Sequence, residues 1–145
     1  MQIKIRTFQL SDYAQLTKVL ELSMSEACFA ESISAVSRQL LWDSSLVLIA
    51  EIESSKEMTG IIIGTIDNNE GYCYRVAVPP QHRRQGIGRS LMRAMQERFM
   101  RRKVRRVLIP LDQHNEPATP FFESLGFGRQ HFTRGCHKLS IVAGT

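Results

Sequence analysis

The chain of 145 residues has the usual length of one domain, and its 43% of hydrophobic residues is enough to bury a core. A formal net charge of +5 favours an anionic partner. Three widely spaced cysteines (Cys28, Cys73 and Cys136) fit neither a disulfide framework nor a zinc site with paired CxxC ligands, and no apolar run reaches the roughly 20 residues that span a bilayer. We therefore expect one domain over residues 1–145, in the cytoplasm, with no metal and no membrane contact.

The first half of the chain predicts a strand (3–9), a helix (11–26), a weaker helix (32–42) and an antiparallel pair of strands (46–52 and 60–66). The first helix has Leu16, Val19 and Leu20 at helical spacing, and Ser11 or Asp12 can cap its start. The strand pair is separated by a polar segment, which is typical of a hairpin connection.

The second half predicts a strand (71–78), an amphipathic helix starting near residue 86, a strand (104–111), a short helix within 115–127, and two strands (128–134 and 137–143). The amphipathic helix is indicated by Ile87, Leu91, Met95 and Phe99, which recur at i+4. The fold class expected is therefore α/β (α+β): one mixed sheet of about seven strands with about four helices.

The stretch VAVPPQHRRQGIGRSLM (76–92) joins a strand to a helix through arginines and two glycines. The first turn of a helix leaves backbone N–H groups unpaired and carries partial positive charge, so it binds phosphate readily. Gly86 and Gly88 have no Cβ to keep a phosphate away, and neighbouring arginines add charge. The loop therefore predicts a pyrophosphate site.

Two common nucleotide-binding motifs are not matched here. The dinucleotide fingerprint requires a third glycine where Leu91 stands, and the Gly-Lys-Ser/Thr of a P-loop is missing. The preceding strand also belongs to an antiparallel set rather than to a βαβ unit. The sequence therefore disfavours an NAD or ATP site.

The same stretch resembles the acyl-CoA-binding signature of the GNAT family of N-acetyltransferases, with Arg83, Gly86 and Gly88 at the signature positions. A second family element, an Asn followed by Ala, an aromatic pair and Gly-Phe, is matched by Asn115, Ala118, Phe121, Phe122, Gly126 and Phe127. Both elements occur in the family's order, with the expected strand between them. The resemblance implies a single GNAT domain over residues 1–145 whose fourth and fifth strands splay apart.

The resemblance also implies a division of labour around acetyl-CoA. The backbone of Val76, Ala77 and Val78 would pair with the pantetheine, and the Val78 N–H would polarise the thioester carbonyl, a contact that contributes roughly 3 kcal/mol when the donor is buried. The residues expected to cradle the pyrophosphate, beside Arg83 of the signature, are Arg84, Gln85, Gly86, Ile87, Gly88 and Arg89. Asn115 would reach the pantetheine, and Phe121 and Phe122 would line the channel beside the sulfur.

The reaction implied is direct transfer to a neutral amine, which needs a group to take the amine proton and benefits from an acid at the leaving thiolate. Many family members carry a tyrosine acid where this chain has Phe122, and some carry a glutamate base where it has Pro110. The remaining candidates are Glu70, Tyr72, Tyr74, His82, Asp112 and His114. We favour Tyr74, although a thiolate that leaves without a protein acid also fits.

Two other functions compete with an N-acetyltransferase. Ten Lys and Arg residues lie between residues 83 and 106, as in some nucleic-acid-binding proteins, but the stretch 98–106 contains only Phe99 as an aromatic, so no nucleic-acid partner is expected. A domain that binds acyl-CoA without turnover is the stronger alternative, because Phe122 has no hydroxyl. The acceptor is expected to be a small-molecule or peptide amine, and the chain to form a possible homodimer.

Overall fold

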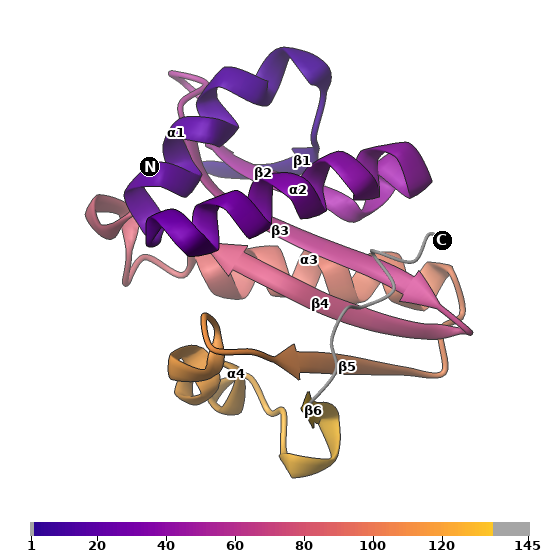
Figure 1. Ribbon diagram of the computed structural model, residues 1–145. Helices are drawn as coiled ribbons and strands as arrows, with labels where there is room; N and C mark the ends of the chain where they lie inside the picture. Colours follow the sequence, from indigo (N-terminus) through magenta and orange to yellow (C-terminus); the bar gives the residue numbers. More distant parts are fainter. Residues whose placement is uncertain (1, 135–145) are drawn as a thin grey trace.

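The computed structural model describes residues 2–134, which form one sheet with helices on both faces (Figure 1). Along the chain the elements are β1 (Ile3–Thr7), α1 (Tyr13–Ser23), α2 (Glu26–Asp43), β2 (Val47–Ile52), β3 (Met58–Asp67), β4 (Glu70–Ala77), α3 (Ile87–Arg101), β5 (Arg106–Leu111), α4 (Thr119–Ser124) and β6 (Phe132–Arg134). The strands lie in the order β1-β2-β3-β4-β5-β6. Pairing is antiparallel from β1 to β4 and parallel from β4 to β6, so the sheet is mixed.

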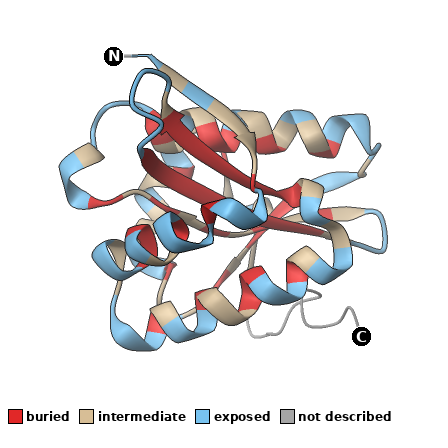
Figure 2. Ribbon diagram, turned by 90° about the horizontal axis from the view of Figure 1, so that it is seen from above, coloured by how far each residue is buried: buried red, intermediate tan, exposed pale blue. Residues whose placement is uncertain are grey.

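The central strands are apolar on both sides because they separate two cores. In β2, Val47 and Ile49 face the core under α1 and α2, whereas Leu48 and Ala50 face the core under α3. This alternation follows from the period of two along a strand. Figure 2 shows the buried strands enclosed between helices whose outer sides are exposed. The alternation thus makes the sheet a rigid partition on which a site can be built.

Helix α3 covers one face of the sheet with a narrow apolar stripe. Ile87, Leu91, Met95 and Phe99 are all buried, as their spacing predicts. Helices α1 and α2 cover the opposite face (Figure 1). No helix within residues 2–134 combines the length and apolar character that crossing a membrane requires.

Strands β4 and β5 pair only at one end. The parallel ladder joins residues 70–72 of β4 to residues 106–108 of β5, and no β5 residue pairs with the later part of β4. Figure 1 shows the two strands separating toward the end of β4 that leads into α3. Strand β4 has a β-bulge opposite Ile63 and Gly64 of β3, directly after the residues of β4 that pair with β5. The expectation that the fourth and fifth strands splay is confirmed.

The fold class expected from the sequence is confirmed, although helix α2 begins earlier than expected. Helix α2 begins at Glu26, six residues before the expected start, because Ser25 caps it by accepting from the Cys28 N–H. The helix expected within 115–127 begins irregularly, as a short 3₁₀ turn (Glu116–Ala118) before α4. Six strands lie among the described residues, and the seventh one expected, over 137–143, falls outside them.

Candidate functional site

A cleft of about 680 Å³ lies where β4 and β5 separate. Its walls come from the α1–α2 connection, the end of β4, the start of α3 and the segment after β5. The lining residues that the sequence predicted for a cofactor are Val76, Ala77, Val78, Arg83, Arg84, Gly86, Ile87, Gly88, Arg89, Asn115 and Phe121. The structure therefore brings two motifs that are almost 30 residues apart to one cavity.

The turn before α3 exposes the start of the helix. Gly86 occupies the N-cap position with φ +80°, in the left-handed region, and Arg84 also has a positive φ of +63°. No side chain caps the helix, and its first turn carries no acidic residue. A Cβ built on Gly86 meets no atom within 4 Å. The N–H groups of the first turn are therefore available to an anion.

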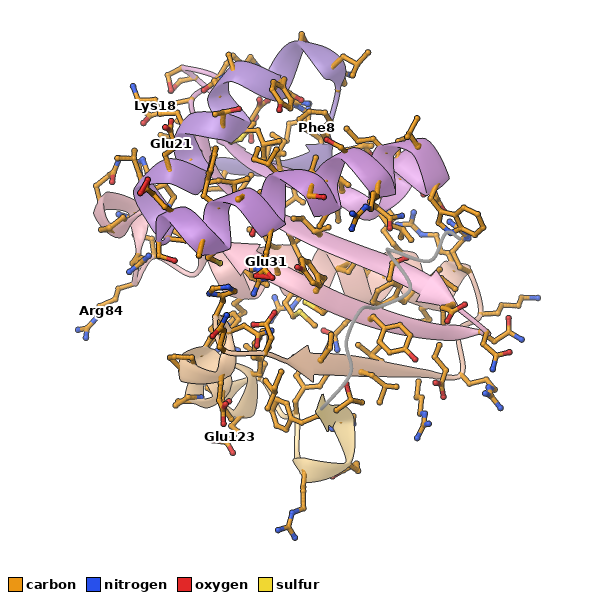
Figure 3. The ribbon with its side chains drawn as sticks, in the orientation of Figure 1. Phe8, Lys18, Glu21, Glu31, Arg84 and Glu123 are labelled. Atoms are coloured by element: carbon orange, nitrogen blue, oxygen red, sulfur yellow. The ribbon has the colours of Figure 1, made fainter. Side chains whose placement is uncertain are left out.

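Arg83 and Arg84 have different tasks despite being neighbours. Arg83 fastens the turn, because its Nε donates to the Val78 carbonyl oxygen at 2.7 Å and its Nη2 to the Ser23 carbonyl oxygen at 3.4 Å. The side chain of Arg84 projects away from the body of the molecule (Figure 3). Arg83 thus shapes the cleft, while Arg84 is free to meet a charged group from solution.

Gly88 serves a purpose that the sequence did not indicate. A Cβ built on it lies 3.1 Å from the ring of Phe121, so its missing side chain lets α4 approach α3. Gly88 therefore has a packing role in addition to the phosphate role expected from the motif, which stays a prediction. Gly86 is the glycine whose Cβ direction is open, and Gly88 closes the apolar wall.

Asn115 is only 7% exposed and holds the loop that follows β5. Its Oδ1 accepts from the Asp112 N–H at 2.8 Å, and its Nδ2 donates to the Pro110 carbonyl oxygen at 2.7 Å. In return Asp112 Oδ1 accepts from the N–H groups of His114 and Asn115 at 2.8 and 3.0 Å. These bonds fix the conformation of residues 110–115 at the edge of the cleft.

Arg75 is a buried member of the cleft wall that sequence reasoning missed. It is 4% exposed, its guanidinium pairs with the Asp112 carboxylate at 3.3 Å, and its Nη2 donates to the Tyr74 hydroxyl at 3.1 Å. Burial by itself lowers the pKa of Arg75, but the contacts with Tyr74 and Asp112 outweigh burial and raise it. The available signal was a lone charge inside an otherwise apolar strand.

The Arg75 pair also holds Asp112 in its ionised form. Burial would raise the pKa of Asp112, but the hydrogen bonds from Arg75 and from two backbone N–H groups lower it below its usual range. A carboxylate in this state stays negative throughout the neutral range. The loop after β5 is therefore tied to β4 by charge as well as by hydrogen bonds.

Three expected site residues do not line the cleft. Phe122 is 2% exposed and packs edge-on against Phe127 and Phe132 in the core, so the expectation that it lines a channel is wrong. The Tyr74 ring packs under α1 and α2, and its hydroxyl lies against Arg75, so the structure does not support Tyr74 as the acid. Gln85 is exposed and also lies outside the cleft lining.

The other acid and base candidates fall into two groups. Tyr72 and Glu70 bond to each other at 3.3 Å at the paired end of β4, away from the cleft. His82 and His114 both line the cleft, and each has a glutamate nearby. His82 lies 3.2 Å from Glu57 beside the turn before α3, whereas His114 faces α2. Of these candidates, only the histidines reach the cavity.

Comparison with known protein families gives one match, and it covers most of the chain. The model of the family described as "Acetyltransferase (GNAT) family" matches residues 16–127. The matched segment begins within α1 and ends three residues after α4. It thus contains both motifs and the whole turn before α3.

Solved structures with the same fold include several N-acetyltransferases. The PaiA N-acetyltransferase from Thermoplasma acidophilum in complex with coenzyme A superposes with a TM-score of 0.73 at 20% identity, over 88% of this chain and 91% of that one. Ard1 from Thermoplasma volcanium gives 0.73 at 20% identity over 88% and 84%. The ribosomal-protein-S18-alanine N-acetyltransferase from Escherichia coli gives 0.67 at 23% identity over 88% and 78%.

Proposed function

Because the chain belongs to the GNAT acetyltransferase family, we propose that it transfers the acetyl group of acetyl-CoA to the nitrogen of a primary amine. One observation carries the proposal: the end of β4 loses its β5 partner directly beside the uncapped start of α3. The first feature offers a strand edge to an extended acyl-pantetheine arm. The second offers unpaired N–H groups to the pyrophosphate at the end of that arm.

The residues present fit acetyl-CoA as the acyl donor. The open Cβ direction of Gly86 leaves room for a pyrophosphate against the first turn of α3, where Arg89 and the solvent-facing Arg84 add charge. The backbone of 76–78 lies along the same cleft. Adjacent strand residues point their N–H groups in opposite directions, so Val76 and Val78 share one direction. We assign the Val78 N–H to the thioester carbonyl.

The reaction proposed is direct attack in a ternary complex. The amine must first lose a proton, because an ammonium has no lone pair. Its nitrogen then bonds to the carbonyl carbon, the carbon–sulfur bond breaks, and the thiolate of CoA leaves. Phe121 in the cleft wall and the buried Phe122 behind it offer no proton donor to the sulfur. The proton left on the attacking nitrogen passes to the departing thiolate.

The acceptor side of the cleft is built by Ser23, Met24 and Cys28 of the α1–α2 region and by His114 across from them. Within residues 2–134, this side of the cleft lining contains no aromatic side chain other than the imidazole of His114 to hold a large planar substrate. The acceptor we propose is a small primary amine or the amino terminus of a peptide. The amino terminus of a protein is one such acceptor to test, since one protein of the same fold is the ribosomal-protein-S18-alanine N-acetyltransferase from Escherichia coli.

The test is release of free CoA thiol from acetyl-CoA in the presence of a panel of primary amines and short peptides. Tertiary amines of similar size serve as matched controls, because they cannot form a stable amide. We expect thiol release that requires a primary amine and an equal amount of acetylated product by mass spectrometry. Binding of acetyl-CoA with no turnover on any amine would instead identify a sensor that binds acyl-CoA.

A further inference from the structure

One ion pair spans the acceptor side of the cleft. His114 Nε2, on the loop after β5, lies 2.6 Å from Glu31 Oε2 on α2. Figure 3 shows the Glu31 side chain on the side of α2 that faces β4 and β5. His114 lines the cleft, and Glu31 remains about half exposed at its rim. The pair thus joins the two walls between which an acceptor has to enter.

The loop that carries His114 is held in place from beneath. Asp112 accepts from the His114 N–H at 2.8 Å, and Asp112 is itself paired with the buried Arg75. Asn115 closes the same loop through its bonds to Asp112 and Pro110. A chain of contacts therefore runs from β4 through the loop to the imidazole and on to α2. These contacts restrict the position of the His114 side chain, and a group that transfers a proton has to be held in this way beside the reacting atom.

One ring nitrogen of His114 is left without a hydrogen bond. His114 Nε2 is buried and makes no hydrogen bond within residues 2–134, although it lies 2.6 Å from Glu31 Oε2. Buried polar atoms are nearly always hydrogen-bonded in folded proteins, so an unsatisfied one in a cleft wall is a place for a ligand.

Resting on the acetyl transfer proposed above, we infer that His114 takes the proton from the acceptor amine and that Glu31 positions His114 for this step. The ammonium N–H bond breaks, its electron pair stays on nitrogen for attack on the thioester carbon, and the proton moves to a ring nitrogen of His114. The resulting imidazolium is balanced by the Glu31 carboxylate. After transfer, His114 returns the proton to water at the open rim of the cleft.

The step has a defined electrostatic setting. The titratable or charged groups around the Glu31–His114 contact are Glu31 and Cys28 from α2, Asp112 from the loop after β5, and Tyr74 and Arg75 from β4. Asp112 and Arg75 neutralise each other, and the Glu31 carboxylate contacts the ring directly. Removing Glu31 therefore acts on the imidazolium form specifically.

The experiment measures kcat/KM against pH for the amine that supports turnover, in the wild type and in His114→Gln, Glu31→Gln and Glu21→Gln. Glu21 is the matched control, because it is an exposed helix glutamate outside the cleft lining. We expect His114→Gln to lower kcat/KM by about 10²- to 10⁴-fold and to lose the acidic limb of the profile. Glu31→Gln should move that limb and lower the rate less, and Glu21→Gln should match the wild type.

Two readouts separate chemistry from structure. Acetyl-CoA should raise the melting temperature of His114→Gln as much as that of the wild type, and free imidazole should restore part of the activity of His114→Ala. Wild-type rates and an unchanged acidic limb in His114→Gln would overturn the assignment while leaving acetyl transfer intact. A wild type that turns over no amine would remove both this assignment and the proposed function.

Discussion

Gly86→Asp tests whether the start of α3 receives the pyrophosphate. Because a Cβ on Gly86 meets nothing within 4 Å, the new side chain fits without displacing the protein. The left-handed φ of +80° costs a non-glycine residue roughly 1 kcal/mol of stability, and Asp and Asn tolerate it best. The fold should survive, and the added carboxylate should lie in the space assigned to the anion.

The expected loss of affinity follows from charge. Two unit charges about 4 Å apart repel by about 1 kcal/mol in water and about 4 kcal/mol at the effective dielectric of a protein surface. CoA should therefore bind Gly86→Asp about fivefold to 10³-fold more weakly by isothermal titration calorimetry. Gly86→Asn is the matched control, because it has the same shape and backbone cost without the charge.

The comparison between these two variants decides the question. The account predicts that Gly86→Asn keeps CoA affinity within a few-fold of the wild type and that the gap between the variants narrows as salt rises, since salt screens exposed charges. Equal dissociation constants for Gly86→Asp and Gly86→Asn would refute the reasoning. If the pyrophosphate bound elsewhere, CoA affinity would be the same with a carboxylate as with an amide at position 86.

Three further predictions concern stability and thiol chemistry. Phe122→Tyr should lower the free energy of unfolding by about 1–3 kcal/mol, because the new hydroxyl would be buried among aromatic rings. Chemical denaturation measures this, and an unchanged stability would contradict the core position of Phe122. Burial raises the pKa of Cys73 to about 12, so Cys73 should resist alkylation in the native protein. Mass spectrometry of the alkylated peptides measures this, and rapid modification of Cys73 without denaturant would contradict its buried position. The hydrogen bonds from Arg6 lower the pKa of Asp12, so the stability from this pair should be present above about pH 4 and be lost as the pH falls through the lowered pKa. Arg6→Gln should flatten that acid dependence in melts from pH 2 to 7, and an unchanged profile would exclude the pair as its source.

The fold could be predicted from the sequence because the strands and α3 carry strong periodic signals. Ile87, Leu91, Met95 and Phe99 specify a buried helix face without reference to any partner, and the expected splay follows from the motif beside it. Helix α2 was placed too late because its start depends on the cap at Ser25, a single weak signal among several serines. Local periodicity therefore predicted the elements better than their ends.

The candidate site was predictable where it rests on backbone and unpredictable where it rests on tertiary contacts. The turn around Gly86 is encoded locally, and the structure places it in the cleft. The contact of Gly88 with Phe121 and the core position of Phe122 depend on how α4 packs against α3, which no local pattern reveals. Arg75 was missed for the same reason, since its partner Asp112 is 37 residues away.

The most direct test of the central claim is a crystal structure of the protein grown with coenzyme A. The account predicts that the pyrophosphate contacts the N–H groups from residue 86 to 89 and that the pantetheine runs along the open edge of β4 beside Val76 and Val78. The sulfur should then lie on the side of the cleft that holds His114. Coenzyme A bound outside the space between β4 and β5, with the start of α3 unoccupied, would contradict the account.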